Sequence, residues 1–220
     1  MHVVVNAAMS ADGKISTRER EQVRVSGPED FERVDQLRAD SDAVMVGVGT
    51  VLADGPSLTV DDPERRRERE QRGDSPNPAR VVADSRMRTP PDARVLDDEA
   101  ETYLLTTEDA PVDFVSETED TGTSVIPAGE SRVDLPAAFD ALEDRGIERM
   151  MVEGGGELIF SLFAAGLVDK LSMFVGPTVI GGRDAPTLAD GEGFVADFAD
   201  LTLRSADRLD EGVVLSWDVP

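Results

Sequence analysis

The chain alternates short apolar runs with segments of helical periodicity, and this order constrains its fold more than any other feature of the sequence. The apolar runs predict strands at about residues 2–8, 42–47, 79–84, 102–106, 123–127 and 148–153. Strands that alternate with helices form a largely parallel sheet with helices on both faces. After Asp169 only strands follow, over residues 169–176, 200–208 and 212–218, and the last two flank a turn at 209–212. The pattern therefore predicts an α/β fold that closes with an antiparallel hairpin.

Three of the intervening segments carry helix start and stop signals. In the first, Ser26 can cap the helix, Glu29 completes a capping box, and the helix should run to about Ala39. Its apolar face would hold Phe31, Val34 and Leu37. The other two helices are predicted over residues 134–145, with Gly146 as the stop, and from the glycines at 154–156 to about Gly166.

The arginine-rich run over residues 63–72, Pro-Glu-Arg-Arg-Arg-Glu-Arg-Glu-Gln-Arg, is the one low-complexity patch. Its mixed charges favour a solvated loop or a frayed helix, and a phosphate-binding role for its arginines is the alternative.

Length and composition favour a single domain over residues 1–220. A chain of 220 residues and 23.7 kDa, 40% of it hydrophobic, can bury a full core. No apolar stretch approaches the roughly 20 residues that span a bilayer, and the first residues predict a strand rather than a signal, so we expect a cytoplasmic protein. The lack of cysteine and the single histidine, His2, argue against disulfides, a zinc site and a Ser-His-Asp hydrolase, so no metal site is predicted.

The charge of the chain is strongly acidic. Forty-six acidic residues face 22 basic ones, which gives a net charge of −24. Such a surface repels phosphate backbones and anionic membranes, so nucleic-acid and lipid partners are not expected. Lys14 and Lys170 are the only lysines. An acidic, lysine-poor surface is typical of salt-adapted proteins, in which molar salt screens the repulsion beyond about 3 Å, so we expect a halophilic protein.

A glycine-rich segment, Val152-Glu153-Gly154-Gly155-Gly156-Glu157, connects a predicted strand directly to a helix. Glycines let a ligand approach the backbone, and the free N–H groups of a helix start bind anions, so a diphosphate bridging two nucleotides is the natural occupant. A tight turn without a ligand is the alternative.

Three further segments follow predicted strands in the same way. They are Gly47-Val48-Gly49-Thr50-Val51-Leu52-Ala53-Asp54, Asn6-Ala7-Ala8-Met9-Ser10-Ala11-Asp12-Gly13-Lys14-Ile15 and Ala83-Asp84-Ser85-Arg86-Met87-Arg88-Thr89-Pro90. The first does not fit the Rossmann fingerprint, but it places Thr50 and Asp54 on one helical face. The second contains an Asp-Gly turn, and the third offers two arginines to phosphates. Open α/β sheets bind ligands at the carboxyl ends of strands, so the four segments together favour a ligand site there.

Five motifs, in order along the chain, resemble those of the riboflavin-pathway reductases. They are N-x-x-M-S-x-D-G-K-I, D-A-V-M-V-G-V-G-T-V-L-A-D-x-P-S-L-T, V-V-A-D-S-R-M-R-T-P, V-E-G-G-G-E-L and G-P-T-V-I-G-G-R-D-A-P-T-L. The family comprises archaeal diaminohydroxy(ribosylamino)pyrimidinone-phosphate reductases and the reductase half of bacterial bifunctional deaminase-reductases. The resemblance runs from about residue 3 to residue 218.

This resemblance implies a dihydrofolate-reductase-like fold, a homodimer, and NADPH as the hydride donor, with NADH left open. The implied reaction converts the ribosylamino group of 2,5-diamino-6-(ribosylamino)pyrimidin-4-one 5′-phosphate to ribitylamino. The sugar opens to an imine at C1′, which a hydride then reduces. The cofactor would carry the hard step, while the protein positions the reactants, excludes water and stabilises charge.

The resemblance also implies roles for individual residues. Cofactor contacts would come from Thr50, Asp54, Ser85, Arg86, Met87, Arg88, Val133, Gly154, Gly155, Gly156 and Glu157. Substrate contacts would come from Asn6, Lys14, Ser26, Arg38 and Glu153. Lys14 and Arg38 would favour the phosphate and Glu153 the ribose hydroxyls, and Lys14 and Glu153 are the catalytic candidates. The alternatives are a cation at a helix end for Arg38 and a hydrogen-bonded turn carboxylate for Glu153.

The chain departs from the family pattern in two ways. Bacterial relatives tend to carry a basic residue for the substrate phosphate where this chain has Asp61, which raises interest in Arg65–Arg67. The deaminase motifs H-x-E and P-C-x-x-C are absent, so we expect deamination to belong to another protein. A pterin or folate reductase of the same fold and a nucleotide-binding dimer without catalysis are the alternative functions.

Overall fold

The computed structural model describes residues 1–109 and 122–220. The chain divides into two compact units, one made of Met1 with Asp35–Met151 and the other of His2–Val34 with Val152–Pro220. Two elements, α1 (Pro28–Ala39) and β6 (Arg149–Gly154), belong to both units because the chain passes from one to the other within them.

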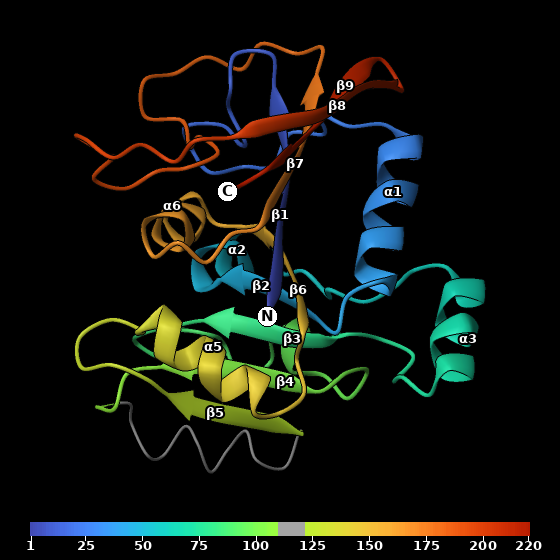
Figure 1. Ribbon diagram of the computed structural model, residues 1–220, viewed down its shortest axis with the longest axis vertical. Coiled ribbons are helices and arrows are strands. Elements are labelled where there is room, and N and C mark those ends of the chain that lie inside the picture. The colour runs from blue at the N-terminus through green and yellow to red at the C-terminus, as the bar shows by residue number, and fades with distance from the viewer. Residues whose placement is uncertain (110–121) are drawn as a thin grey trace. The chain divides into compact units, whose positions relative to one another are not determined.

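The first unit contains a parallel sheet. Its strands β2 (Ala43–Gly47), β3 (Ala79–Ala83), β4 (Thr102–Thr106) and β5 (Thr123–Pro127) lie in the order β5-β4-β3-β2 (Figure 1). All five residues of β4 are buried, as expected for a parallel strand covered on both faces. The helices of this unit are α2 (Val48–Asp54), α3 (Pro63–Arg72) and α5 (Leu135–Glu143), with a 3-10 turn at Arg94–Leu96.

Helix α5 forms where its local signals predict it. The carboxylate of Asp134 accepts the N–H of Ala137 and caps the helix. The buried residues recur at helical spacing and are Leu135, Ala138, Phe139 and Leu142. Gly146 follows the helix with a φ of 86°, a left-handed conformation that ends a helix at low cost in glycine.

The second unit contains a mixed sheet. Strand β1 (His2–Ser10) pairs in parallel with β7 (Lys170–Gly176), β9 (Gly212–Asp218) pairs antiparallel with β7, and β8 (Thr202–Leu209) pairs antiparallel with β9. The predicted closing hairpin is therefore confirmed. Figure 1 shows α1 and α6 (Gly156–Ala164) on opposite sides of the β1–β7 pair. No helix in the described ranges is long and apolar enough to cross a membrane.

The start of α1 is capped differently from the prediction. Asp210, in the turn between β8 and β9, accepts the backbone N–H groups of Glu29 and Asp30 through its two carboxylate oxygens. The Glu29 carboxylate in turn accepts the Asp210 N–H at 3.5 Å. A Cβ on Gly27 would lie 2.4 Å from the Asp210 Cγ, so Gly27 leaves the space that this carboxylate occupies. Reciprocal capping hydrogen bonds are therefore present at the start of α1, but the capping carboxylate comes from Asp210 and not from the predicted Ser26.

The buried face of α1 also differs from the predicted apolar one. Phe31 is 51% exposed, whereas Asp30 and Asp35 are 1% and 5% exposed. Both buried carboxylates have cationic partners, because Asp30 pairs with Arg33 at 2.8 Å and Asp35 with Arg65 at 2.7 Å. Each ion pair offsets the cost of removing the carboxylate from water. The pattern of apolar residues alone does not show that these carboxylates are buried.

The arginine-rich run forms the helix α3, so of the two expected forms the loop is wrong and the helix is the one observed. Asp62 caps its start by accepting the Glu64 N–H, and Gly73 ends it with a φ of 91°. Arg69 is only 3% exposed and donates to the carbonyls of Ala39, Ser41 and Ser75. These carbonyls include one at the end of α1, so a buried arginine on α3 satisfies backbone acceptors that a helix leaves open.

Candidate functional site

The loop after β3 is organised by a buried carboxylate that the sequence did not single out. Asp84 is fully buried, and its Oδ2 accepts the N–H of Arg88 at 2.6 Å and both the N–H and the hydroxyl of Thr89 at 2.7 and 2.8 Å. The same carboxylate accepts the Arg86 N–H at 3.4 Å. One side chain thus fixes the backbone of residues 86–89.

This loop leaves its two arginines exposed and joins two predicted cofactor residues. The side chains of Arg86 and Arg88 are exposed, and Met87 between them has a φ of 51°. The hydroxyl of Ser85 accepts the Val133 N–H at 3.0 Å, although the two residues are 48 positions apart. Exposed guanidinium groups on a fixed backbone suit the binding of a phosphate.

Thr50 and Asp54 lie on α2 as predicted. They are one turn apart, and Gly55 ends the helix in the left-handed conformation. Arg38, the substrate candidate in the same unit, lies in the last turn of α1 and donates to the Thr59 carbonyl at 3.0 Å. Arg65 and Arg66 are engaged within the protein, with Arg65 on Asp35 and Arg66 on the Val60 carbonyl at 2.5 Å.

The glycine-rich segment joins β6 to α6 in the second unit. Glu153 is half-buried near the end of the strand, and Glu157 is exposed in the first turn of the helix. Gly155 precedes the helix with a φ of 95°, a conformation that favours glycine. At Gly156 a Cβ would lie 2.7 Å from Asp190 Oδ2 and 2.8 Å from the Thr187 carbonyl, so the protein's own chain requires this glycine.

Lys14 follows the predicted Asp-Gly turn, in which Gly13 has a φ of 80°. Its Nζ donates to the Ala185 carbonyl at 2.9 Å. In the same turn, the Asp12 carboxylate accepts the Ser10 hydroxyl at 2.6 Å and the Ile180 and Gly181 N–H groups at 3.0 and 2.7 Å. These hydrogen bonds, with that from Ser10 the largest contribution, lower the pKa of Asp12 to about 2.

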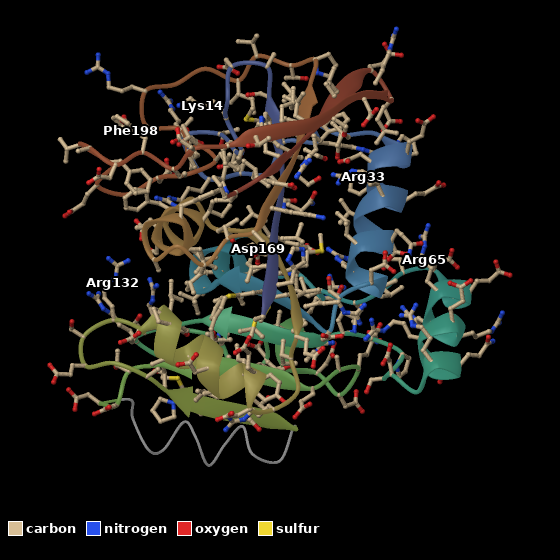
Figure 2. The ribbon with its side chains drawn as sticks, viewed as in Figure 1. Lys14, Arg33, Arg65, Arg132, Asp169 and Phe198 are labelled. Carbon is tan, nitrogen blue, oxygen red and sulfur yellow. The ribbon has the colours of Figure 1, made fainter. Side chains whose placement is uncertain are left out.

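Asn6 belongs to a polar network beneath α1. It is 5% exposed, and its Oδ1 accepts a hydrogen bond from Arg33 at 2.9 Å. Arg33, which Figure 2 labels on α1, also donates to the Ser172 hydroxyl at 2.8 Å and to Asp30 at 2.9 Å. Asn6 and Ser172 are partners in the β1–β7 register, so Arg33 holds one pair of facing side chains. Ser26 is half-buried ahead of α1.

The predicted site residues therefore divide between the two units. The first unit holds Thr50, Asp54, Ser85, Arg86, Met87, Arg88, Val133 and Arg38, and the second holds Asn6, Lys14, Ser26, Glu153, Gly154, Gly155, Gly156 and Glu157. Within the units the structure joins Ser85 to Val133 directly. The sequence pattern assigned no functional role to Asp84 or Arg33, and the only local signal was that Asp84 ends a predicted strand, within the segment that carries Arg86 and Arg88. Over residues 1–109 and 122–220, no cluster of histidine and acidic side chains could hold a metal ion.

Comparison with known proteins identifies relatives over the whole chain. The model of the RibD C-terminal domain matches residues 1–215. A protein of Archaeoglobus fulgidus named 2,5-diamino-6-ribosylamino-4(3H)-pyrimidinone 5′-phosphate reductase is 47% identical over 98% of this chain and 96% of its own length. A protein of the same name from Methanothermobacter thermautotrophicus is 44% identical over 99% of this chain and 98% of its own.

Solved structures show the same fold. A pyrimidine reductase-like protein of Corynebacterium diphtheriae matches with a TM-score of 0.87 and 20% identity, over 100% of this chain and 92% of that one. RibD of Acinetobacter baumannii matches with a TM-score of 0.79 and 22% identity, over 100% of this chain and 58% of that one. These likenesses confirm the predicted dihydrofolate-reductase-like fold. With a family model that matches nearly the entire sequence, this chain belongs to the RibD C-terminal domain family.

Proposed function

We propose that this chain is an NADPH-dependent reductase that converts the ribosylamino side chain of 2,5-diamino-6-(ribosylamino)pyrimidin-4-one 5′-phosphate to ribitylamino in riboflavin biosynthesis. The observation that carries the proposal is the 47% identity, over nearly the full length of both chains, to a protein named as that reductase. The two ordered loops that carry the predicted site residues give the proposal a local chemical basis.

Each unit contains predicted cofactor residues whose chemistry suits part of a nicotinamide dinucleotide. In the first unit, Asp84 fixes a loop that presents the exposed guanidinium groups of Arg86 and Arg88, which suit phosphate groups. In the second unit, α6 begins directly after glycine, and its first N–H groups suit the diphosphate. Glu157, a carboxylate in that first turn, would accept hydrogen bonds from hydroxyl groups rather than contact phosphate, because like charges repel. The bound cofactor would supply the hydride.

On the substrate side, the chain supplies cations and acceptors. The Lys14 ammonium has three donors, and one of them is held by the Ala185 carbonyl, so the group is fixed while it faces a phosphate. Arg38, in the first unit, is the other cation that the resemblance assigns to the substrate. Glu153 would accept hydrogen bonds from the sugar hydroxyls as the ring opens to the imine. One hydride at C1′ and one proton at the nitrogen then complete the amine.

The preference for NADPH, the homodimer, the cytoplasmic location and the adaptation to salt belong to the same proposal. Arg86 and Arg88 support NADPH over NADH, because the extra 2′-phosphate is an anion that paired guanidinium groups recognise. The net charge of −24 supports a protein that works in concentrated salt and binds neither nucleic acid nor membranes.

The proposed function is tested by following NADPH oxidation with two substrates in parallel, the ribosylaminopyrimidine phosphate and dihydrofolate. We expect oxidation with the first alone. Oxidation with dihydrofolate alone would instead identify a folate reductase of the same fold. Binding of NADPH without turnover of either substrate would identify a nucleotide-binding protein.

A further inference from the structure

A continuous series of contacts joins the turn that carries Lys14 to the start of α6. Beyond the hydrogen bond from Lys14 Nζ to the Ala185 carbonyl, the backbone of Lys14 forms an antiparallel bridge with Thr187. At the other end, the Asp190 N–H donates to the Gly156 carbonyl at 3.0 Å. The segment 185–190, here named the strap, thus contacts a substrate candidate and a cofactor candidate within one unit.

One carboxylate oxygen fixes the shape of the strap. Asp190 Oδ1 accepts the Thr187 hydroxyl at 2.6 Å and the Thr187 N–H at 3.1 Å. A hydrogen bond from a hydroxyl to an ionised carboxylate at this length is among the stronger ones in proteins. Both donors belong to Thr187, so these hydrogen bonds close a turn from Thr187 to Asp190. Thr187 is the residue that bridges Lys14, and Asp190 is the residue that contacts Gly156.

The strap packs closely against Gly156 in the first turn of α6. As the absent Cβ of Gly156 would meet both Asp190 and Thr187, the strap can approach the helix only because glycine stands there. A shift of the strap would therefore be transmitted to the helix start, since the two are in van der Waals contact as well as hydrogen-bonded.

The chain ahead of the strap is fastened to the same turn. Asp12 holds the backbone N–H groups of Ile180 and Gly181, and the Ala11 N–H donates to the Thr178 carbonyl at 2.8 Å. The low pKa of Asp12 keeps this anchor ionised near neutral pH. The chain is thus tied by Asp12 ahead of the strap and by Gly156 at the end of the strap.

We propose that Thr187 and Asp190 are positioning residues of this reductase. Their hydrogen bond holds the strap so that the Lys14 ammonium and the start of α6 keep a fixed spacing. The inference rests on the proposed function, in which Lys14 meets substrate and α6 meets cofactor. A misplacement of about 1 Å away from the reacting atoms can cost roughly a hundredfold in rate, so such a tie matters for catalysis.

The first test compares three variants by steady-state kinetics. Thr187→Val keeps the shape and removes the hydroxyl donor, and we expect kcat/KM to fall at least about tenfold, whereas Thr187→Ser keeps the donor and should stay within about threefold of wild type. Thr178→Val, ahead of the strap, is the matched control, because its hydroxyl takes no part in the contacts above, and it should retain wild-type kinetics. A Thr187→Val enzyme with wild-type kcat/KM would overturn the proposal.

A double-mutant cycle separates positioning from a purely structural role. If Thr187 acts through Lys14, the increase in KM caused by Thr187→Val combined with Lys14→Ala should be smaller than the product of the single increases. If the increase in KM of the double variant equals the product of the single increases, and the melting temperature also falls, Thr187 has a structural role and the proposal is contradicted. Should Thr187→Val not fold, Asp190→Asn keeps the shape and weakens the same bond, and its kcat/KM should fall in the same direction by a smaller factor.

The two proposals fail in different ways. A wild-type enzyme that does not oxidise NADPH with the ribosylaminopyrimidine phosphate would contradict the proposed function. An active wild-type enzyme whose Thr187 variants behave as wild type would contradict the role of the strap alone.

Discussion

Single charged side chains form hydrogen bonds with several backbone groups that the loops of this protein would otherwise leave unpaired. Asp84 accepts three hydrogen bonds from Arg88 and Thr89 through one oxygen, and Arg69 donates to three carbonyls. Each side chain replaces several hydrogen bonds to water that folding removes. Removing one of these side chains would therefore leave several buried polar groups without a hydrogen-bond partner.

The residue Asp84 offers a direct test of the loop that carries Arg86 and Arg88. In Asp84→Asn, one carboxylate oxygen becomes an NH₂ group that cannot accept hydrogen bonds, so part of this set is lost. We expect the free energy of unfolding to fall by about 1–3 kcal/mol and NADPH affinity, measured by fluorescence titration, to weaken about tenfold, or about 1.4 kcal/mol.

A matched control distinguishes loop order from general stability. Asp42 accepts the N–H groups of Glu148 and Arg149 in the same unit, so Asp42→Asn should destabilise the protein and leave NADPH affinity unchanged. Equal NADPH affinity in the two variants would contradict the role given to the loop after β3.

Tyr103 provides a test of burial in the first unit, because it is the only tyrosine of the chain. Burial, with the neighbouring Glu101 as the second cause, raises the pKa of Tyr103 to about 12. Since the unfolded pKa is about 10, the folded state is favoured below pH 10 and loses this advantage as the pH rises through 12. The phenolate absorbance should therefore titrate near pH 12 in the folded protein and near pH 10 in denaturant, and a single midpoint near 10 in both would contradict the burial of this ring.

At the scale of elements, local signals sufficed where a helix is stabilised by its own residues. Helix α5 carries its cap, its apolar face and its terminal glycine within the segment, so its sequence predicts it. Helix α3 does not, because Arg69 finds its acceptors at the end of α1 and in the following loop. The buried face of α1 was mispredicted for the same reason, because the partner of Asp35 is an arginine 30 residues away in the sequence.

The cap of α1 is a tertiary feature with a measurable cost. Asp210 accepts two N–H groups at the start of α1, although it lies 181 residues from Glu29 in the sequence. Asp210→Ala removes this acceptor, and we expect the free energy of unfolding to fall by about 1 kcal/mol. Urea unfolding monitored by the single tryptophan, Trp217, reports on this unit. Glu211→Ala, the neighbouring exposed residue of the same turn, should cost much less. If Ser26→Ala proved more costly than Asp210→Ala, the cap would be the local one that the sequence predicts.

At the scale of the whole molecule, the family match spans both compact units, and so do the predicted site residues. The order of strands and helices, and the final hairpin, follow from periodicity and turn signals. The predicted residues were drawn from ordered motifs, and the structure places many of them near strand ends and helix starts, whereas Asn6 lies within β1 and Arg38 and Asp54 lie at helix ends. Asp84, Thr187 and Asp190 hold those motifs in place through hydrogen bonds within their own loops, which follow no helix or strand periodicity and so are not displayed by one sequence.

The acidic composition predicts how the whole molecule responds to salt. With a net charge of −24, repulsion between carboxylates should weaken the folded state at low ionic strength, and molar salt should relieve it. We expect the melting temperature and the reductase activity to rise between about 0.1 and 2 M KCl. The rise should be seen both by Trp217 fluorescence and by the absorbance of Tyr103, and a melting temperature independent of KCl would contradict salt adaptation.

The transfer of deuterium from labelled NADPH tests the central claim most directly. The enzyme is incubated with the ribosylaminopyrimidine phosphate and NADPH carrying deuterium at the transferable position of the nicotinamide ring, and the product is examined by mass spectrometry and NMR. We expect a ribitylamino product with one deuterium at C1′ for each cofactor oxidised. Deuterium at any other carbon, or no product while NADPH is bound, would contradict it.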